Sequence, residues 1–353
     1  MEIEGTVIAG RAFEPIEGRV VVENGEITAV EEASVDSSAI VLPAFVNAHT
    51  HIGDSLAKEA GAGLSLDELV APPDGLKHRL LRAASREELV DAMDRTVSFM
   101  GQGGTSAFVE FREGGVVGVR AIEEALTGSS LDAGIALVSC RPPVLGGRRD
   151  VEVGQSIEAM YEADGYGASG ANDGDFERER AATREAEKLF AIHAGERDTS
   201  DIDAALALDP DLLVHMVHAE PTHVERVAER ETPVAVCPRS NLVTGVGLGP
   251  VEALVERTTV ALGTDNVMLN NPSMFREMEF AAKLFDLSAG KVLEMATLAG
   301  AEVAGLDRGV IEEGAEAKLC VLDGDSPNLA GAQDVVRAVV RRAGVSDIER
   351  IVY

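Results

Sequence analysis

Residues 43–54 read Pro43-Ala44-Phe45-Val46-Asn47-Ala48-His49-Thr50-His51-Ile52-Gly53-Asp54, an apolar run that ends in two histidines one residue apart. Because successive side chains of a strand point to opposite faces, His49 and His51 leave the same face. Two neutral imidazoles at the end of a buried strand supply half of a tetrahedral or trigonal-bipyramidal site for a divalent metal. The alternative is a pair of core histidines that only satisfy backbone groups, so the rest of the chain must decide between them.

The composition is that of a globular protein. The 353 residues, 45% of them hydrophobic, are enough for one large α/β barrel or two ordinary domains. There is no apolar run of 18 residues, and Met1–Gly5 lacks the basic and apolar regions of a signal peptide, so we expect a cytoplasmic location and no membrane partner. The three cysteines are widely separated and odd in number, which argues against disulfides and against a cysteine-based zinc site.

The chain is strongly acidic. Its formal net charge is −30, and only six of its 31 basic residues are Lys. So much negative charge repels nucleic acid and anionic membranes. It is also the surface expected in a cytoplasm of high salt, where screening removes the self-repulsion of like charges. We therefore expect a halophilic protein that binds no nucleic acid.

Both ends of the chain have the sequence pattern of a small antiparallel β-sheet. Residues 2–41 alternate strand-like runs with glycine turns, and Asn24-Gly25 predicts a hairpin. The same pattern returns after residue 306. We predict that residues 1–41 and 307–353 pair into one β-sandwich that flanks a central domain of residues 42–306.

The central domain alternates apolar runs with amphipathic segments such as 86–101, 176–187 and 222–230, which is typical of repeated βα units. Eight candidate strands can be listed: 40–49, 104–111, 135–140, 165–168, 189–193, 212–215, 233–237 and 260–265. Eight strands predict an α/β fold of the closed (β/α)₈ (TIM) barrel type, with functional residues at the carboxyl ends of the strands. The irregular segment 55–85, after the first strand, is predicted to lie over the barrel mouth.

Chemically reactive side chains follow several of these strands. His193 ends the fifth strand with Glu196 three residues later, His215 ends the sixth, and Asp265 ends the eighth. Singly, each residue has another interpretation: a satisfied core histidine, a capping aspartate or a solvated glutamate. Four strand ends that each carry His or Asp, in a chain with seven histidines, favour a shared metal.

At this point the sequence resembles the amidohydrolase superfamily, and more narrowly its mononuclear aminohydrolases, which include cytosine, adenosine and S-adenosylhomocysteine deaminases and chlorohydrolases. The resemblance covers nearly the whole chain, and the terminal β-sandwich is also a feature of the family. The matching segments are residues 43–54 for strand one, His193 to Glu196 for the His-x-x-Glu of strand five, His215 to His218 for strand six, Cys237 to Leu242 for the Asn-Pro-x-Ser-Asn-Leu of strand seven, and Val260 to Asn266 for the Gly-Thr-Asp of strand eight.

The resemblance implies one divalent metal, Zn²⁺ first and Fe²⁺ as the alternative, with the ligands His49, His51, His193 and Asp265. It implies that the metal activates a water, that Asp265 accepts its proton, and that His215 orients the attacking hydroxide. Glu196 would protonate a ring nitrogen and then the departing ammonia. Because the fourth strand, residues 165–168, has no lysine to bridge a second metal, a mononuclear site is expected.

Substrate contacts are harder to assign. Ser169 stands after strand four, where nucleoside-type deaminases often have a histidine, and Cys237 replaces another frequent histidine. His78 lies in the segment that could cover the site, and Arg79 or Arg141 could hold an anionic group. The substrate-binding candidates are His78, Arg79, Arg141, Ser169 and Asn266.

The prediction is therefore a metal-dependent hydrolase that deaminates a small nitrogen heterocycle of the purine, pterin or pyrimidine type. Hydrolysis of a cyclic amide or another C–N bond is the alternative within the same chemistry. A non-catalytic metal-binding barrel is less favoured, because a purely structural metal needs no proton shuttle beside an open coordination position. The expected partner is a small-molecule substrate, and a homo-oligomer is left open.

Overall fold

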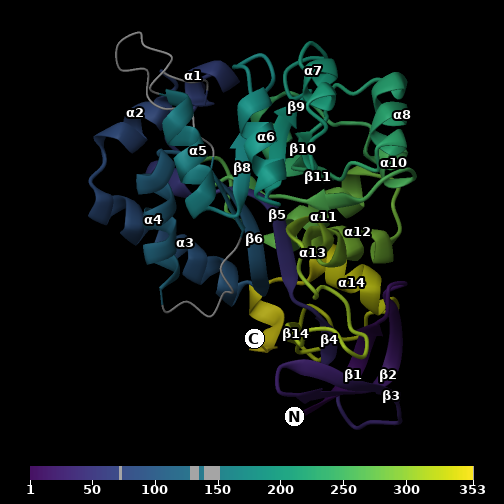
Figure 1. Cartoon of the computed structure of the whole chain (residues 1–353). Coiled ribbons are helices and arrows are strands. Elements are labelled where there is room, and N and C mark those ends of the chain that lie inside the picture. The colour runs from purple at the N-terminus through teal and green to yellow at the C-terminus, as the bar shows by residue number, and fades with distance from the viewer. Residues whose placement is uncertain (71–73, 128–134, 139–151, 353) are drawn as a thin grey trace.

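The computed structural model describes residues 1–70, 74–127, 135–138 and 152–352, which form a parallel sheet surrounded by helices and a second sheet at one end of the molecule (Figure 1). The strands are β1 Glu2–Ala9, β2 Glu14–Glu23, β3 Glu26–Glu32, β4 Ile40–Pro43, β5 Phe45–His51, β6 Thr105–Arg112, β7 Ile135–Val138, β8 Gly165–Ala168, β9 Leu189–Ala194, β10 Leu212–His215, β11 Val234–Val236, β12 Val260–Leu262, β13 Asp265–Asn266, β14 Leu319–Leu322 and β15 Ile348–Val352. The α-helices are α1 Leu66–Val70, α2 Leu76–Ala83, α3 Arg86–Gln102, α4 Gly115–Leu126, α5 Glu152–Glu162, α6 Glu177–Glu185, α7 Ile202–Ala207, α8 Pro221–Glu229, α9 Pro238–Thr244, α10 Val251–Val255, α11 Met274–Leu284, α12 Ala289–Ala296, α13 Leu298–Ala304 and α14 Val335–Arg342; short 3₁₀ helices are η1 Ile52–Ala57 and η3 Val345–Asp347. No helix within these ranges is both long and apolar enough to span a bilayer.

The larger sheet closes on itself. Its strands follow the chain in the order β5, β6, β7, β8, β9, β10, β11, β12, and all neighbours are parallel. The chain leaves β12 and after two residues forms β13, which pairs with β5 at Asp265 with Thr50 and Asn266 with His51. The last strand is thereby joined to the first, and the carboxyl ends of all the strands meet at one end of the closed sheet.

Two local features allow this closure. A Cβ atom on Gly263 would lie 2.7 Å from Cβ of His49, so only glycine lets the β12–β13 connection approach β5 this closely. Asn47 then joins the two segments, since its side-chain nitrogen donates to Thr264 Oγ1 at 2.7 Å and its oxygen accepts from the Thr264 backbone N–H at 3.0 Å. The strand that carries the two histidines is thus fixed against the segment that carries Asp265.

The strands of this sheet are buried on both faces, as expected for a parallel sheet covered by helices. All eight residues of β6 are buried. Outside it, α3 begins with a capping box in which Ser85 and Glu88 satisfy each other's backbone N–H groups. Its buried residues recur at helical spacing and face the sheet: Ala92, Met93, Thr96, Val97, Met100 and Gly101.

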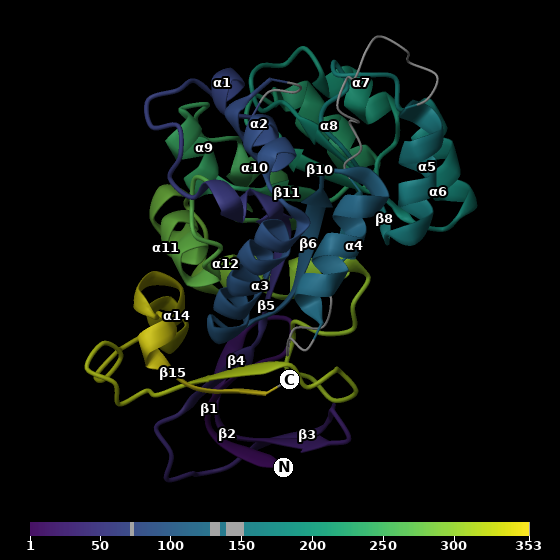
Figure 2. The same cartoon turned by 90° about the vertical axis from the view of Figure 1, so that its left-hand side faces the viewer.

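The smaller sheet combines both ends of the chain in the order β15-β14-β4-β1-β2-β3, and it lies at the opposite end of the molecule from α1 and α7 (Figure 2). Strand β4 runs parallel to β1 and antiparallel to β14, so it links the two chain ends. The β3 edge also approaches the segment before β14, because the Ile27 N–H donates to the Ala315 oxygen and the Ala317 N–H donates to the Gly25 oxygen. The six strands therefore curl rather than lie flat.

Several sequence expectations need correction. The predicted first strand, residues 40–49, is two strands: β4 belongs to the smaller sheet and β5 to the closed sheet, and the chain changes sheets at Ala44 after Pro43. The predicted eighth strand is likewise divided into β12 and β13. The segment 55–85 is not all irregular, since it contains α1 and α2. The helices predicted at 86–101, 176–187 and 222–230 are present as α3, α6 and α8.

Candidate active site

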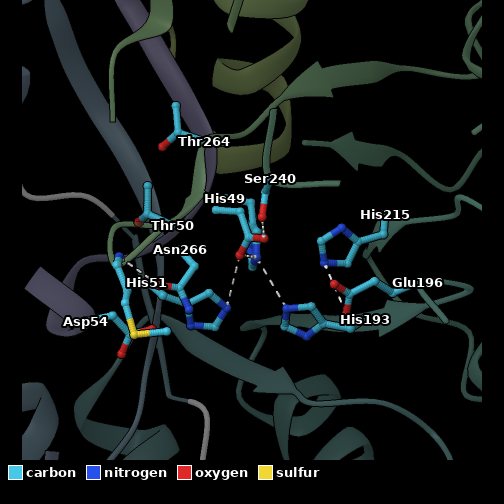
Figure 3. Close-up of polar contacts among 12 residues, drawn as sticks. His49, Thr50, His51, Asp54, His193, Glu196, His215, Ser240, Thr264 and Asn266 are labelled. Carbon is cyan, nitrogen blue, oxygen red and sulfur yellow. Dashed lines mark hydrogen bonds and ion pairs between the residues drawn. The ribbon is translucent and has the colours of Figure 1, made fainter. Parts of the chain in front are cut away.

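Four side chains from three different parts of the closed sheet converge at its carboxyl end, and we call His49, His51, His193 and Asp265 the donor cluster. Figure 3 shows the three rings directed toward one another. The His49 Nε2 atom lies 3.3 Å from His193 Nε2 and 3.3 Å from Asp265 Oδ1, and the His51 Nε2 atom lies 3.6 Å from the same carboxylate oxygen. The four residues that the strand ends suggested are therefore brought together.

Hydrogen bonds and burial keep two of these imidazoles neutral. The His193 Nδ1 atom is 2.9 Å from the backbone oxygen of Ala168, which can only accept, so Nδ1 carries the proton and Nε2 presents a lone pair to the cluster. Burial lowers the pKa of His193 well below its usual value, and burial lowers that of His49 to about 4. Neutral imidazoles with inward lone pairs are what metal ligation requires.

For the other two members, Asp265 and His51, neighbouring groups of opposite charge favour the ionised form. Burial opposes ionisation of Asp265, but its hydrogen bond to His49 and the nearby histidines hold the pKa of the carboxyl group well below its ordinary value. Burial and the Lys77 charge lower the pKa of His51, but Glu113 and Asp265 outweigh them and raise it. The Oδ2 atom of Asp265 accepts a hydrogen bond of 2.5 Å from Ser240 Oγ, which leaves Oδ1 facing the rings.

His215 and Glu196 lie beside the donor cluster. The His215 ring is 5.4 Å from the His193 ring, centroid to centroid, and its Nε2 atom is 3.8 Å from Glu196 Oε2. The His215 Nδ1 atom is 3.2 Å from Asn241 Oδ1, which accepts its proton in a hydrogen bond. Asn241 therefore fixes the tautomer in which Nε2 has a free lone pair.

The backbone is left-handed where two of these residues leave their strands. The φ angles are +75° at His215 and +58° at Asp265, a conformation that costs energy for residues other than glycine. Both residues are buried. The fold thus tolerates local strain in order to direct these two side chains into the site.

A cavity of about 210 Å³ opens directly over the donor cluster. Its wall includes Glu196 and His215 and, from the segment after β5, Lys77 and His78. Apolar residues contribute as well: Leu66, Val70 and Leu269. The space is of the right kind for a small heterocycle that enters with one face on apolar side chains and one edge toward the donor cluster.

The predicted substrate-binding residues fall into three groups. His78, Ser169 and Asn266 line the cavity. His78 Nε2 is 3.0 Å from the Val70 oxygen, and Ser169 Oγ is buried without a hydrogen-bond partner among the described residues. Arg79 is exposed and is not among the cavity residues, because it follows His78 on a helix and neighbours on a helix point to different sides. Arg141 lies outside the described residues.

A second buried polar group adjoins His51, and we call Asp54, Lys77, Glu110, Arg112 and Glu113 the charge network. Lys77 Nζ lies 2.6 Å from Glu113 Oε1 and 3.1 Å from Asp54 Oδ2. Arg112 lies 2.9 Å from Glu113 Oε2 and 3.1 Å from Glu110 Oε1. Glu113 Oε1 faces the outer nitrogen of His51, Nδ1, at 3.4 Å. A carboxylate behind a metal-binding histidine orients the ring and raises its basicity.

Sequence reasoning assigned no role to Ser240, to Asn241 or to any member of the charge network. Ser240 and Asn241 lie in the segment that resembles the strand-seven motif, but nothing in that pattern says which side chain they contact. Glu113 follows β6 directly, so the rule that functional residues sit at strand ends could have found it. Lys77 comes from the segment between β5 and α3 and carries no such signal.

The donor cluster fits a divalent metal. Three imidazole nitrogens and one carboxylate oxygen face a common point, and His193 Nε2 offers a lone pair there because the Nδ1 atom of the same ring donates to Ala168. A cation at this point would compensate the buried charge of Asp265 and accept the lone pairs of the rings. His49, His51 and Asp265 are each less than one-tenth exposed.

Comparison with known proteins agrees with this site. The Amidohydrolase family model matches residues 40–347. An Archaeoglobus fulgidus protein, provisionally named an aminohydrolase, is 36% identical over 92% of this chain and 90% of its own. The 5-methylthioadenosine/S-adenosylhomocysteine deaminase of Halobacterium salinarum is 30% identical over 100% of this chain and 90% of its own. The crystal structure of a zinc-bound adenosine deaminase from Xanthomonas campestris shares the fold, with a TM-score of 0.82 at 23% identity, over 99% of this chain and 90% of its own. The chain belongs to the amidohydrolase family.

Proposed function

We propose that this protein is a metal-dependent aminohydrolase that removes ammonia from an aminopurine, most simply an adenine nucleoside or a derivative of one. The observation that supports this best is the position of Glu196: it lines the cavity and lies beside the donor cluster and His215. A relative that aligns with the whole chain is named a 5-methylthioadenosine/S-adenosylhomocysteine deaminase. Hydrolysis of a cyclic amide remains the alternative, because it needs the same nucleophile.

The residues that would hold the metal are those of the donor cluster, and Zn²⁺ suits their imidazole and carboxylate ligands. The bound ion would supply an activated water nucleophile near neutral pH. Asp265 stays ionised because its pKa is held low, so its carboxylate can take up a proton in the site. The hydrogen bond from Ser240 keeps that carboxylate oriented toward the rings.

Glu196 and His215 would handle the substrate. A protonated Glu196 can donate to a ring nitrogen of a heterocycle in the cavity, and after it takes up a proton from the attacking water it can deliver that proton to the departing ammonia. His215 presents Nε2 with a free lone pair, because Asn241 accepts the Nδ1 proton, and it can therefore orient a nucleophile that approaches the ring. The left-handed backbone at His215 directs this ring into the cavity.

The proposal includes the domain organisation. Residues 42–306 would form the (β/α)₈ barrel, and residues 1–41 with 307–353 would form the flanking β-sandwich. The closure of the parallel sheet through β13 and the curled sheet shared by the two chain ends support this division. A salt-adapted surface also belongs to the proposal, supported by the net charge of −30. Thermal stability should then rise between about 0.1 M and about 1 M salt, as the Debye length falls from about 10 Å to about 3 Å.

A substrate panel tests the function. The metal-loaded protein in high salt should release ammonia from at least one of adenosine, 5′-deoxyadenosine, methylthioadenosine or S-adenosylhomocysteine, and much more slowly from cytosine. The Glu196→Gln variant is the matched control, since it keeps the shape of the side chain. Release of ammonia from no aminopurine, together with opening of a cyclic amide, would replace deamination with the alternative.

A further inference from the structure

A lysine inside the charge network occupies a place that could otherwise hold a cation. His51, Asp54 and Glu113 each offer a ligand atom within 4.8 Å of the others, which would suit a metal ion. The ammonium group of Lys77 lies among them, 3.1 Å from Asp54 Oδ2 and 2.6 Å from Glu113 Oε1. Lys77 is only 5% exposed and Asp54 only 1%. Among the described residues, Lys77 is the group that pairs with the buried carboxylate of Asp54 and compensates its charge.

We infer that Lys77 takes the place of a second divalent cation and thereby keeps the metal centre mononuclear. The inference rests on the metal centre of the proposed function. It adds the reason why one ion, rather than two, would bind at this end of the sheet. Figure 3 shows Asp54 close to His51, so the two cation positions would be neighbours that share this histidine.

Charge balance supports this assignment. In its ionised form the charge network has three carboxylates and two cations, which leaves one surplus negative charge. The donor cluster has one carboxylate, so one divalent ion would leave it with one surplus positive charge. Because burial raises the pKa of Glu110 to about 7, the two buried groups together then carry between zero and one positive charge near neutral pH, and no negative charge is left to compensate a second divalent ion. A second divalent ion beside Lys77 would add two uncompensated positive charges in a buried region, which is strongly unfavourable.

The same lysine has a positioning role. Lys77 and Arg112 each bind one oxygen of Glu113, and this leaves Glu113 Oε1 directed at His51 Nδ1. A carboxylate held from both sides cannot turn away from the ring behind which it lies. Lys77, which also lines the cavity, therefore acts on the metal through Glu113 and His51.

The test uses two metals with different ligand preferences. The donor cluster is rich in imidazole and is loaded with Zn²⁺, and the carboxylate position is then probed with Mn²⁺, which prefers oxygen ligands. Zinc per chain is measured by elemental analysis, and bound Mn²⁺ is measured by electron paramagnetic resonance. We expect the wild type to bind one Zn²⁺ and no further Mn²⁺, and the Lys77→Met variant to bind one Mn²⁺ in addition. The Lys77→Arg variant, which keeps the charge, should behave as the wild type.

A double variant identifies the position of the new ion. Lys77→Met combined with Asp54→Asn should lose the added Mn²⁺ and keep Zn²⁺, because only one carboxylate remains at the vacated place. If Lys77→Met alone does not fold, Lys77→Gln serves for the same measurement, since its amide can still hydrogen-bond to one carboxylate.

The inference is overturned if the folded Met or Gln variant, loaded with Zn²⁺, binds no more Mn²⁺ than the wild type up to about 1 mM, the weak end of oxygen-ligand sites. Wild-type protein that retains no Zn²⁺ would instead remove the proposed metal centre and this inference with it. A wild type with one Zn²⁺ and an unresponsive Lys77 variant would remove the inference alone, so the two failures are distinguishable.

Discussion

The donor cluster and the charge network are both buried and polar, and they meet at His51, but their polar atoms are satisfied in opposite ways. In the charge network each cation lies within 3.1 Å of two carboxylate oxygens from different residues. In the donor cluster the nearest atoms of His49 and His193 are two ring nitrogens 3.3 Å apart, and His193 Nε2 has only a lone pair to offer because its ring proton lies on Nδ1. The charge network pairs its carboxylates with its own lysine and arginine, whereas the donor cluster contains no lysine or arginine.

This difference separates a structural role from a chemical one. Buried charges that pair with one another fix neighbouring segments, here η1, α2 and the end of β6, around His51. Lone pairs that face one another cost stability, and a protein retains them where a ligand will compensate. The two site residues with a left-handed backbone also belong to this region: Asp265 is part of the donor cluster, and His215 lies beside it. The predictions below break one region at a time, beginning with the largest expected effect.

Asp265→Ala should abolish both metal retention and turnover. The substitution removes a ligand and the proton acceptor together, and several kcal/mol of lost stabilisation correspond to a fall in turnover of about 10³-fold or more. The matched control is Ser240→Ala, which removes only the hydrogen bond to Asp265 Oδ2 and should keep the metal. Elemental analysis and the rate of ammonia release measure the two effects. Normal metal content in the Asp265 variant would show that Asp265 is not a ligand.

The metal-free protein should lose stability in mild acid because of His49. Its pKa is about 4 in the folded chain and about 6.5 when unfolded. Between these values the unfolded state binds more protons, so the free energy of unfolding falls as the pH falls from about 6.5 to about 4. A shift of this size is worth about 3 kcal/mol.

Urea unfolding of the metal-free wild type and of His49→Gln, at pH 7.5 and at pH 4.5, measures this contribution. The wild type should lose more stability than the variant between the two pH values. Equal losses would mean that His49 is protonated in the folded chain, contrary to the neutral ring inferred here.

Glu196→Gln should lower turnover by roughly 10² or more while metal content stays at the wild-type value. Glutamine keeps the shape of the side chain and most of its hydrogen bonding, but it has no proton to transfer. The measurement is steady-state ammonia release beside elemental analysis of the same sample. Full activity in this variant would leave Glu196 as an ordinary cavity carboxylate and would remove the support for deamination.

Glu113→Gln should weaken metal binding by about 10- to 100-fold, because it weakens the carboxylate behind His51. Glu110→Gln is the control within the same network. Glu110 accepts from Thr50 Oγ1 and from the Ile52 N–H, whereas the carboxylate that faces His51 Nδ1 is that of Glu113. Competition with a chelator gives both affinities. If the two variants lose affinity equally, the effect comes from general damage to the network and not from Glu113.

Much of the site follows from one rule about parallel sheets. The carboxyl ends of the strands meet at one end, so His49, His193, His215 and Asp265 could be expected close together from the sequence. The α/β barrel class could also be predicted from the sequence, because apolar runs and amphipathic segments alternate along the chain. The family match confirms the resemblance that the strand-end motifs indicated.

The features that could not be predicted lie in segments whose apolar residues show no regular helix or strand spacing. Lys77 reaches the site because α2 turns back over η1, and no periodicity in residues 55–85 indicates this. Pro43 looks compatible with one continuous strand, yet it ends β4, and the chain changes sheets there. The irregular sequence around His78 and Arg79 predicts a loop over the site, but both residues lie on α2, and the helix sends the two side chains to different sides.

The most direct test of the account is turnover measured against bound metal. The protein is stripped with a chelator, reloaded with Zn²⁺ in steps, and assayed for ammonia release from its best aminopurine substrate, with metal per chain determined at each step. We predict that activity is absent without metal, rises in proportion to bound Zn²⁺ and levels off at one ion per chain. Full activity in the stripped protein, or a plateau reached only at two ions per chain, would contradict a mononuclear metal-dependent deaminase.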